Sequence, residues 1–445
     1  MPISNSSGGV APAEPHRRRA GLTGIPLRRL GNPIGRSTVL AVLLALGLAG
    51  CAAPPPPPQP PPAPVAAAPL PPREAQDLDA AVDSLATAVL ARAELPPAAA
   101  GQPRRIVIDP LIDRATGAET RTTRAMARRI AAKLQGDAGF DLRPFTQASL
   151  DAKPLVLLGA ISGVTAAGSL KDSTEEPGAY RIWAVLADLG SGKVVAHETA
   201  WVRTEAVDAT PTEFHRDSPV WLPDRATAAY LKVCAAPAGA PIDPAWQRGL
   251  RASTLLAQAT AAYEAREPAR ALSLYRAADK AGPTGRLQGL NGEYLTAHAL
   301  GRTDEAEQAF GKLVDYGLAE RNLGVKFLFA VGQTSFWPDK AISGPYPMWL
   351  RQIARRTATD NACLDVVGHA SPTGPDALND RLSLARAQRI KADLVAEQAS
   401  LRPRTATEGR GAREPIVGNK RDDATDAVDR RVAFLPQSCG AVASR

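Results

Sequence analysis

The sequence predicts a multidomain α/β protein in which three folded regions follow an N-terminal targeting segment and a proline-rich linker. Three observations support this prediction. Residues 76–220 alternate helix-like and strand-like hydrophobic patterns, residues 247–318 show helical periodicity alone, and residues 323–437 return to alternation. The chain of 445 residues is long enough for about two to four domains with their own hydrophobic cores.

The composition is typical of a globular protein, with 22% charged and 44% hydrophobic residues. The formal net charge is +8, but the basic residues are spread along the chain instead of forming a stripe. Neither a zinc-finger spacing nor a helix-turn-helix pattern accompanies them. We therefore expect no nucleic-acid binding.

Residues 1–50 have the pattern of a targeting segment. Arginines precede the apolar stretch at 37–50, STVLAVLLALGLAG, which is shorter than a membrane-spanning helix and typical of a signal peptide. The stretch ends in Leu48-Ala49-Gly50-Cys51, which resembles a bacterial lipobox. The resemblance implies diacylglyceryl transfer to the Cys51 thiol, cleavage before it and acylation of the new amine. The alternative is a chance cysteine after an ordinary signal peptide.

The residue after Cys51 is Ala52 instead of Asp, which among such lipoproteins favours sorting to the outer membrane. Several acyl chains anchor a protein stably where one does not. We therefore expect a lipid-anchored protein of the outer membrane that faces the periplasm.

Residues 51–75 form a proline-rich tether, AAPPPPPQPPPAPVAAAPLPPR, within a chain that holds 40 prolines in all. Proline fixes φ and lacks a backbone donor, so this stretch should adopt extended polyproline II. At roughly 3.1 Å per residue it would reach about 60 Å. Such a tether would hold the folded regions away from the membrane.

Region one, residues 76–220, predicts an α/β sandwich with helices on one face of a sheet. A hairpin turn is expected at Gly190-Ser191-Gly192, between two strand-like stretches. The expected helices are 77–95 and 122–135, and the expected strands are 104–113, 140–145, 153–164, 180–189 and 193–202.

Three stretches of region one carry a resemblance: IVIDPLIDRATG (106–117), VLLGAISGV (156–164) and YRIWAVLADLGSGKVV (180–195). They resemble the small α/β domain of lipoproteins that activate penicillin-binding proteins, and of curli-secretion and flagellar-associated lipoproteins. The resemblance implies a module that binds an envelope protein partner. The GSGK within the third stretch is no P-loop, because Ala187 and Val194 replace its first Gly and its Ser or Thr.

Region two, residues 247–318, is predicted to be helical. Two of its stretches align at an offset of 35, so that Ala271 matches Ala306 and Tyr275 matches Phe310. Small residues followed four positions later by an aromatic resemble tetratricopeptide repeats. Two copies are too few for a free-standing solenoid, so we expect a short bridge packed on its neighbours. The alternative is a dedicated peptide-binding groove.

Region three, residues 323–437, alternates strands and helices in a fixed order. The helix at 377–397 has apolar residues near one face, including Leu378, Leu382 and Ile390. The expected strands are 324–331, 363–370, 404–411 and 430–436, and the expected helices are 346–358 and 377–397.

Ordered motifs mark this region: Gly-His at 368–369, N-x-x-LS-x-x-RA at 379–387, EGRG at 408–411 and DRRV at 429–432. Together they resemble the OmpA-like peptidoglycan-binding domain. The resemblance implies a βαβαββ fold with a pocket for the peptide stem of peptidoglycan. In that family an Asp shortly after the Gly-His pair engages the ammonium of diaminopimelate, and a helix Arg engages its carboxylate.

The resemblance assigns binding roles to Asn379, Arg386, Arg430 and Arg431. Ser371 stands where the family has its Asp, and a hydroxyl accepts a hydrogen bond without offering negative charge. On this view Ser371→Asp would restore the ion pair and tighten binding. Asp376, in the same loop, is a candidate for the missing charge, with helix N-capping or a solvated loop as the alternative.

A catalytic role is not expected. His369 lies near Ser371 and Asp376 in the sequence, but no GxSxG elbow accompanies them, and a His bonded within the strand-to-loop turn is the simpler interpretation. The sequence has no HExxH motif, no cofactor loop and no cysteine with ligand spacing. We therefore expect no enzyme activity, no cofactor and no metal.

The cysteines also allow a disulfide, since the periplasm is oxidising. Cys363 opens the second predicted strand of region three and Cys439 lies just beyond the last, so antiparallel pairing would bring them together. We predict this bridge, with free buried thiols as the alternative, and a free Cys234.

The leading functional hypothesis is a non-enzymatic outer-membrane lipoprotein that binds peptidoglycan through region three. The second is a regulatory or scaffold lipoprotein that acts on a cell-wall synthase or secretion complex through region one. Ser371 favours the second hypothesis, whereas Asn379, Arg386 and Arg431 favour the first. A wall hydrolase would need a catalytic constellation that the sequence does not contain.

Overall fold

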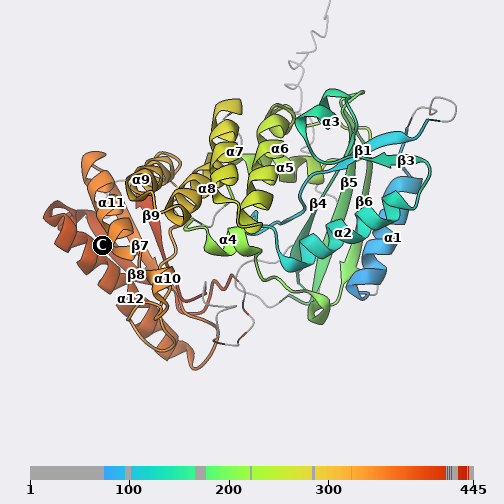
Figure 1. Ribbon diagram of the computed structural model, residues 1–445. Helices are drawn as coiled ribbons and strands as arrows, with labels where there is room; N and C mark the ends of the chain where they lie inside the picture. Colours follow the sequence, from blue (N-terminus) through green and yellow to red (C-terminus); the bar gives the residue numbers. More distant parts are fainter. Residues whose placement is uncertain are drawn as a thin grey trace, which may run out of the picture. The chain divides into compact units, whose positions relative to one another are not determined.

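The computed structural model describes residues 75–95, 102–165, 177–220, 223–282, 286–321 and 323–416, together with 418, 420, 422, 429–437 and 439. The predicted signal peptide, Cys51 and most of the predicted tether lie outside the described residues. Within these described ranges, no helix has the length and apolar character needed to cross a membrane. Helices and strands alternate along the chain, which confirms the mixed α/β class (Figure 1).

Region one forms a mixed sheet in the order β3-β1-β4-β5-β6, with β2 paired to β4. β1 runs parallel to β3 and β4, whereas β4, β5 and β6 pair antiparallel. Each strand overlaps a stretch where the sequence predicts one, and β5 and β6 form the expected hairpin. The strands are β1 (Arg104–Ile108), β2 (Ile112–Asp113), β3 (Phe140–Leu142), β4 (Leu155–Val164), β5 (Ala179–Asp188) and β6 (Lys193–Val202).

Helices cover both faces of this sheet, so the expectation of helices on one face is wrong. Helices α1 (Leu78–Ala91) and α2 (Arg121–Gln135) pack on one face (Figure 1). Helices α5 (Arg225–Cys234) and α6 (Pro244–Glu264) pack on the other. The reason lies in β4, which is apolar and buried along nearly its whole length, so that both of its sides need an apolar partner.

Region two continues from α6 through α7 (Pro268–Ala281), α8 (Arg286–Ala299) and α9 (Thr303–Ala319). Its aligned residues Ala271, Tyr275, Ala306 and Phe310 are all buried. A Cβ placed on Gly292 of α8 would overlap the Tyr275 ring. This glycine therefore lets α8 approach α7 closely.

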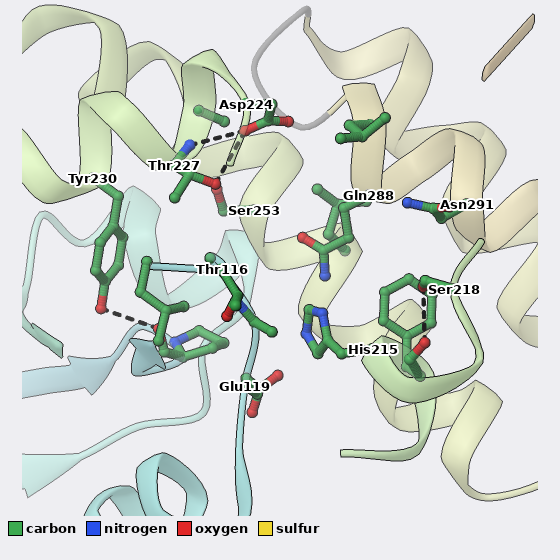
Figure 2. A pocket seen from close by; sticks show the side chains of 18 of the residues that line it. Thr116, Glu119, His215, Ser218, Asp224, Thr227, Tyr230, Ser253, Gln288 and Asn291 are labelled. Carbon is green, nitrogen blue, oxygen red and sulfur yellow. Dashed lines mark hydrogen bonds between the residues drawn. The ribbon is translucent and has the colours of Figure 1, made fainter. Parts of the chain in front are cut away.

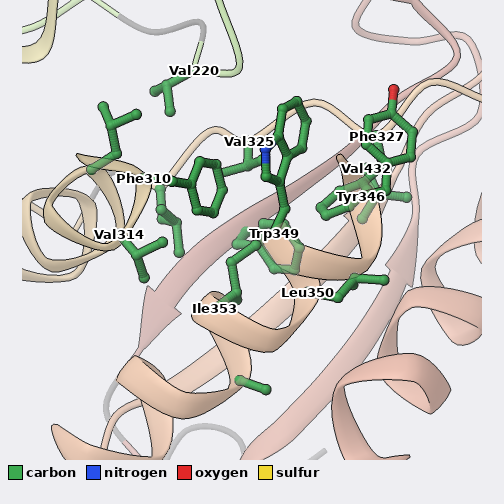
Figure 3. Close-up of a cluster of buried hydrophobic side chains, with 14 of the residues drawn as sticks. Val220, Phe310, Val314, Val325, Phe327, Tyr346, Trp349, Leu350, Ile353 and Val432 are labelled. Carbon is green, nitrogen blue, oxygen red and sulfur yellow. The ribbon is translucent and has the colours of Figure 1, made fainter. Parts of the chain in front are cut away.

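Region two shares its cores with both neighbours. Trp246 and Leu250 of α6 pack with the sheet of region one, while α8 and α9 pack with region three. The clearest contact is between Phe310 of α9 and Trp349 of α11 (Tyr346–Thr359), whose rings stack with centroids 5.2 Å apart and planes 5° from parallel (Figure 3). These helices are thus part of a continuous apolar interior.

Region three has a sheet in the order β8-β7-β9. β7 runs parallel to β8 and antiparallel to β9. The long helix α12 (Asp376–Glu397) connects β7 to η2 (Ala399–Arg404) and β8, as the sequence predicts. The strands are β7 (Cys363–Gly368), β8 (Thr405–Gly409) and β9 (Val432–Gln437), and the short helix α10 (Lys340–Ser343) precedes α11.

The expected first strand of region three, residues 324–331, is not a regular strand. It makes only isolated bridges, between Val220 and Val325 and between Phe329 and Phe336. Val325, Phe327 and Phe329 are all fully buried. Apolar side chains therefore hold this segment in the core, while its backbone bonds to varied partners, including the Tyr346 hydroxyl at 3.1 Å from the Leu328 nitrogen.

A disulfide links Cys363 to Cys439. The antiparallel register of β7 and β9 places Cys363 opposite Gln437, so the chain reaches Cys439 beside it. Cys234 is a buried free thiol on α5.

Candidate binding site of the C-terminal region

Two motif glycines allow α12 to lie directly against the ends of β7 and β8. A Cβ on Gly368 would overlap the Ser383 carbonyl, and one on Gly409 would lie 2.6 Å from the Leu384 nitrogen. Ser383 is also the small residue of the helix motif, and its Oγ accepts a 2.9 Å hydrogen bond from the Gly411 nitrogen. The motifs at the strand ends therefore contact the motif on the helix directly.

The loop between β7 and α12 is held from both ends. The Ala370 nitrogen donates to the Gly411 carbonyl at 2.8 Å. The buried Asn379 side chain donates through Nδ2 to the Thr373 carbonyl at 3.0 Å. Asn379 thus shapes the loop, and its side chain is used within the fold.

Ser371 is buried in this loop, and its hydroxyl donates to a carboxylate from a distant part of the chain. The acceptor is Asp422, which lies 51 residues further along the chain. The Thr373 hydroxyl donates to the other oxygen of the same carboxylate at 2.6 Å. Position 371 therefore lacks its own charge but lies in contact with one.

The Asp422 carboxylate is held in its ionised form. Its partial burial alone would raise its pKa, but the hydrogen bonds from Ser371 and Thr373 outweigh that effect. The positive charges of Arg430 and Arg386 act in the same direction, so the pKa of Asp422 lies below its usual range.

Arg430 lies beside this carboxylate. Its Nη1 is 3.4 Å from the Asp422 Oδ1, and its Nε donates to the Phe329 carbonyl at 3.4 Å. The guanidinium also lies over the Trp337 ring, 5.3 Å from the centroid. With only 1% of its surface exposed, Arg430 is built into the site.

Arg386 braces three backbone segments at once. Its Nε donates to the Gln333 carbonyl at 3.0 Å, its Nη1 to His369 at 3.0 Å and its Nη2 to Ala330 at 3.1 Å. Burial and the nearby Arg430 lower its pKa to about 10, against the opposing charge of Asp422. Arg386 therefore has a structural task in addition to any role in binding.

Arg431 and Asp376 lie apart from this cluster of hydrogen bonds. Arg431 donates through Nη1 and Nη2 to the Glu414 carbonyl at 3.2 Å, and burial lowers its pKa to about 10. Asp376 is exposed at the first helical residue of α12, and Pro375, not Asp376, is the N-cap. Asp376 is thus no N-cap, and the carboxylate in contact with Ser371 belongs to Asp422.

His369 is an uncharged part of the turn. Its backbone nitrogen donates to the Arg431 carbonyl at 2.9 Å. Burial, together with the charges of Arg431 and Arg410, lowers the pKa of its ring to about 2. The His369 Nδ1 lies 3.6 Å from the Glu414 Oε2. Because the ring is neutral, this contact is not an ion pair.

Asp422 is not among the site residues that the sequence predicts. Several aspartates lie between the EGRG and DRRV motifs, and no spacing singles this one out. Only the path of the chain back to Ser371 identifies it.

Residues 347–428 match the protein-family model described as the OmpA family, so this part of the chain is an OmpA family domain. Among curated proteins, the chain is similar to the outer membrane protein Omp38 of two Acinetobacter baumannii strains. The identity is 43% over 92 residues, which make up 20% of this chain and 26% of that protein. The chain thus spans about a quarter of the length of these relatives.

Solved structures with partial similarity include the peptidoglycan-associated lipoprotein from Burkholderia pseudomallei. It is 18% identical, with a TM-score of 0.22, and the match covers 25% of this chain and 89% of that one. The cell wall anchor of the T6SS from Pseudomonas aeruginosa is 22% identical, with a TM-score of 0.21 and coverage of 29% and 97%.

Proposed function

We propose that this protein binds peptidoglycan non-covalently through its OmpA family domain and so links the outer membrane to the cell wall. The observation that carries the proposal is the Asp422 carboxylate, which Ser371 and Thr373 hold beside two buried arginines. This arrangement offers an acceptor and a cation within one loop-and-helix site.

Diaminopimelate in the peptide stem requires both kinds of group, because its side-chain end carries an ammonium and a carboxylate. In our proposal Asp422 accepts from the ammonium, in the role that the family gives to the residue at position 371. The guanidinium of Arg386 suits the carboxylate, because its fork makes charge-assisted hydrogen bonds. Its backbone contacts use three of its five N–H groups.

The other predicted residues act through the shape of the site. Asn379 holds the loop that carries Ser371, and Arg430 holds the Asp422 carboxylate in place. Arg431 fixes the Glu414 segment. Asp376 is exposed and offers at most a peripheral contact.

The proposal is tested by co-sedimentation of the full chain with purified sacculi. Asp422→Asn removes the charge and keeps the size, so we expect binding to weaken about tenfold, as for the loss of one charge-assisted contact. Asp393→Asn is the matched control, because Asp393 pairs with Arg389 on α12 outside the site. Equal sedimentation of both variants with the wild type would contradict a role for this pocket.

Arg386→Ala needs a stability control. The change removes a cation from the site, but it also removes hydrogen bonds to three carbonyls. We therefore expect both weaker binding and a lower melting temperature. Binding is to be compared at temperatures where the variant remains folded.

The anchor at Cys51 completes the proposed function. In our proposal the lipobox-like sequence at Cys51 anchors the protein in the outer membrane, and the proline-rich tether holds the folded regions in the periplasm. Lipid attachment and a wall-binding domain at the two ends of one chain would join the two layers.

A second candidate is a regulatory or scaffold lipoprotein that contacts a wall-synthesis or secretion complex through region one. The observation in its favour is that the sheet of region one has an apolar core on each face, with α5 and α6 completing one of the two. In either case we propose that α6 to α9, as tetratricopeptide-like helices, connect the two functional ends. Loss of sacculus binding together with retention of an envelope protein partner would favour this candidate.

A further inference from the structure

A cavity of about 140 Å³ lies at the carboxyl end of β1. Its walls come from the segment 109–119 that follows β1, from the region of α4 (Glu213–Asp217), and from α5, α6 and α8. Figure 2 shows side chains from these elements pointing toward one another across the space. In α/β folds, the carboxyl ends of parallel strands are where ligands bind.

Asp109 is the buried carboxyl of this cavity. It is the first residue after β1, and only 4% of its surface is exposed. One of its oxygens accepts a 3.2 Å hydrogen bond from Trp246 Nε1. Within the described part of the chain, the other oxygen has no hydrogen-bond partner and no cation pairs with this carboxyl.

Burial without a cation is unfavourable for the ionised form of Asp109. Burial raises its pKa to about 7, against the Trp246 hydrogen bond and with a further contribution from the nearby Glu119. A cation beside Asp109 would therefore stabilise its ionised form.

The described groups near Asp109 do not supply a free cation to pair with it. Glu119 pairs with Arg124 at 3.2 Å, but the same guanidinium also binds Glu264 at 2.6 Å. Asp224, another lining residue, is used as the N-cap of α5 and accepts from the Thr227 nitrogen at 2.9 Å. The wall around Asp109 thus has more negative than positive charge.

The opposite wall offers uncharged hydrogen-bonding groups. Asn291 of α8 is 4% exposed, and its Oδ1 accepts from the Val220 nitrogen at 3.3 Å. Its amide nitrogen points toward the cavity (Figure 2). His215 lines the same space with a neutral ring, because burial and the charges of Arg124 and Lys326 lower its pKa to about 3.

We propose that this cavity binds a small organic amine, with its ammonium against Asp109 and Glu119 and its body against the apolar part of the wall. The ligand ammonium supplies the cation that Asp109 lacks, and Asn291 donates to an oxygen on the ligand. Phe214, Leu256 and Leu287 are apolar residues of this wall. A cavity of about 150 Å³ holds a ring of the size of benzene, so the ligand body is of that size.

The test compares two probes of equal shape on the full chain: cyclohexylamine, which carries an ammonium, and cyclohexanol, which does not. Titration calorimetry and saturation-transfer NMR measure binding. We expect saturable binding of the amine at least tenfold tighter than that of the alcohol. No saturable amine binding, or equal binding of both probes, would overturn the proposal and leave a water-filled or merely apolar cavity.

Asp109→Asn keeps the size of the side chain and removes its charge. It should weaken amine binding at least tenfold and leave alcohol binding unchanged. The matched control is Asp79→Asn, since the Asp79 side chain is 71% exposed on α1. Unchanged amine binding in Asp109→Asn would overturn the proposal.

A second variant covers the case in which Asp109→Asn does not fold. Ser253→Phe introduces a ring from α6 into the cavity, where Ser253 is a lining residue. It should abolish binding of both probes, and persistent amine binding would also overturn the proposal.

Discussion

At position 371 a hydroxyl stands where OmpA-like domains carry a carboxylate, and the structure brings a carboxylate to it from Asp422. The negative charge is therefore present in the site, but it is carried by Asp422 instead of the residue at position 371. This changes what substitutions at position 371 should do. From the sequence alone, Ser371→Asp restores a missing charge, whereas in the structure it places two carboxylates against each other.

We therefore expect Ser371→Asp to weaken binding to sacculi. The change removes the hydroxyl donor to Asp422 and introduces a like charge, which disfavours ionisation of the pair. A loss of about 1 to 2 kcal/mol, or roughly five- to thirtyfold in affinity, follows from such a contact. Tighter binding than wild type in the co-sedimentation assay would show that Asp422 does not fill the acceptor role.

A second residue-scale prediction concerns pH. Burial raises the pKa of Asp109 to about 7 in the folded protein, above its ordinary value of 3.8. Between these two values the folded state binds more protons than the unfolded state, so this group lowers stability as pH rises. Asp109→Asn should therefore stabilise the protein increasingly from about pH 4 to pH 7, by up to a few kcal/mol.

The measurement is the urea midpoint of wild type and Asp109→Asn across this pH range. Asp79→Asn, an exposed change on α1, is the control. A constant difference between wild type and Asp109→Asn at all pH values would contradict the raised pKa.

At the scale of elements, small residues in the motifs let α12 pack directly against the ends of β7 and β8. Gly368 and Gly409 permit the helix to touch the strand ends, and Ser383 bonds across the gap. The antiparallel pairing of β7 with β9 then places the two cysteines together. Packing against α12 thus fixes the ends of β7 and β8, and the disulfide fixes the start of β7.

The element-scale prediction is that Cys439→Ser destabilises the protein. The disulfide joins residues with a sequence separation of 76, and a loop of this size adds a few kcal/mol by limiting the unfolded chain. Urea denaturation should show the loss in wild-type protein treated with reductant and in the untreated variant alike. Labelling of unreduced, denatured wild type at Cys363 or Cys439 would refute the bridge.

For the whole molecule, the shared cores connect the region that carries the amine cavity to the OmpA family domain. Residues of α6 pack with the sheet of region one, and residues of α8 and α9 pack with α11. The described residues from 75 onward accordingly form one compact unit. The helices of region two are therefore integral to the fold.

At this scale we predict that the position of the protein in the envelope depends on one thiol. Cys51→Ala removes the acceptor for the lipid, so the protein should move from the detergent-extracted membrane fraction to the soluble periplasm. Fractionation and mass spectrometry of the N-terminus measure this change. Unchanged membrane retention of the variant, with no acyl chain on the wild type, would exclude the anchor.

The sequence by itself determined the order of helices and strands in regions one and three, because their hydrophobic periodicity is local. It also identified the OmpA family domain from its motifs. The motif glycines permit a close approach of helix and strands, and Asn379 and Arg386 bond to the loop and the strand end beside them. The tertiary structure alone decided that helices cover both faces of the first sheet and that residues 324–331 lie in the core without a regular ladder. These outcomes depend on which apolar surfaces meet.

The tertiary structure alone also supplied Asp422 to Ser371 and joined Asp109 and Asn291 at one cavity. The physical reason is common to both sites. A side chain's charge is given by the sequence, but the groups around it are set by the folded backbone. The carboxylate beside Ser371 lies 51 residues away in the chain, and Asp109 and Asn291 line one cavity from different elements.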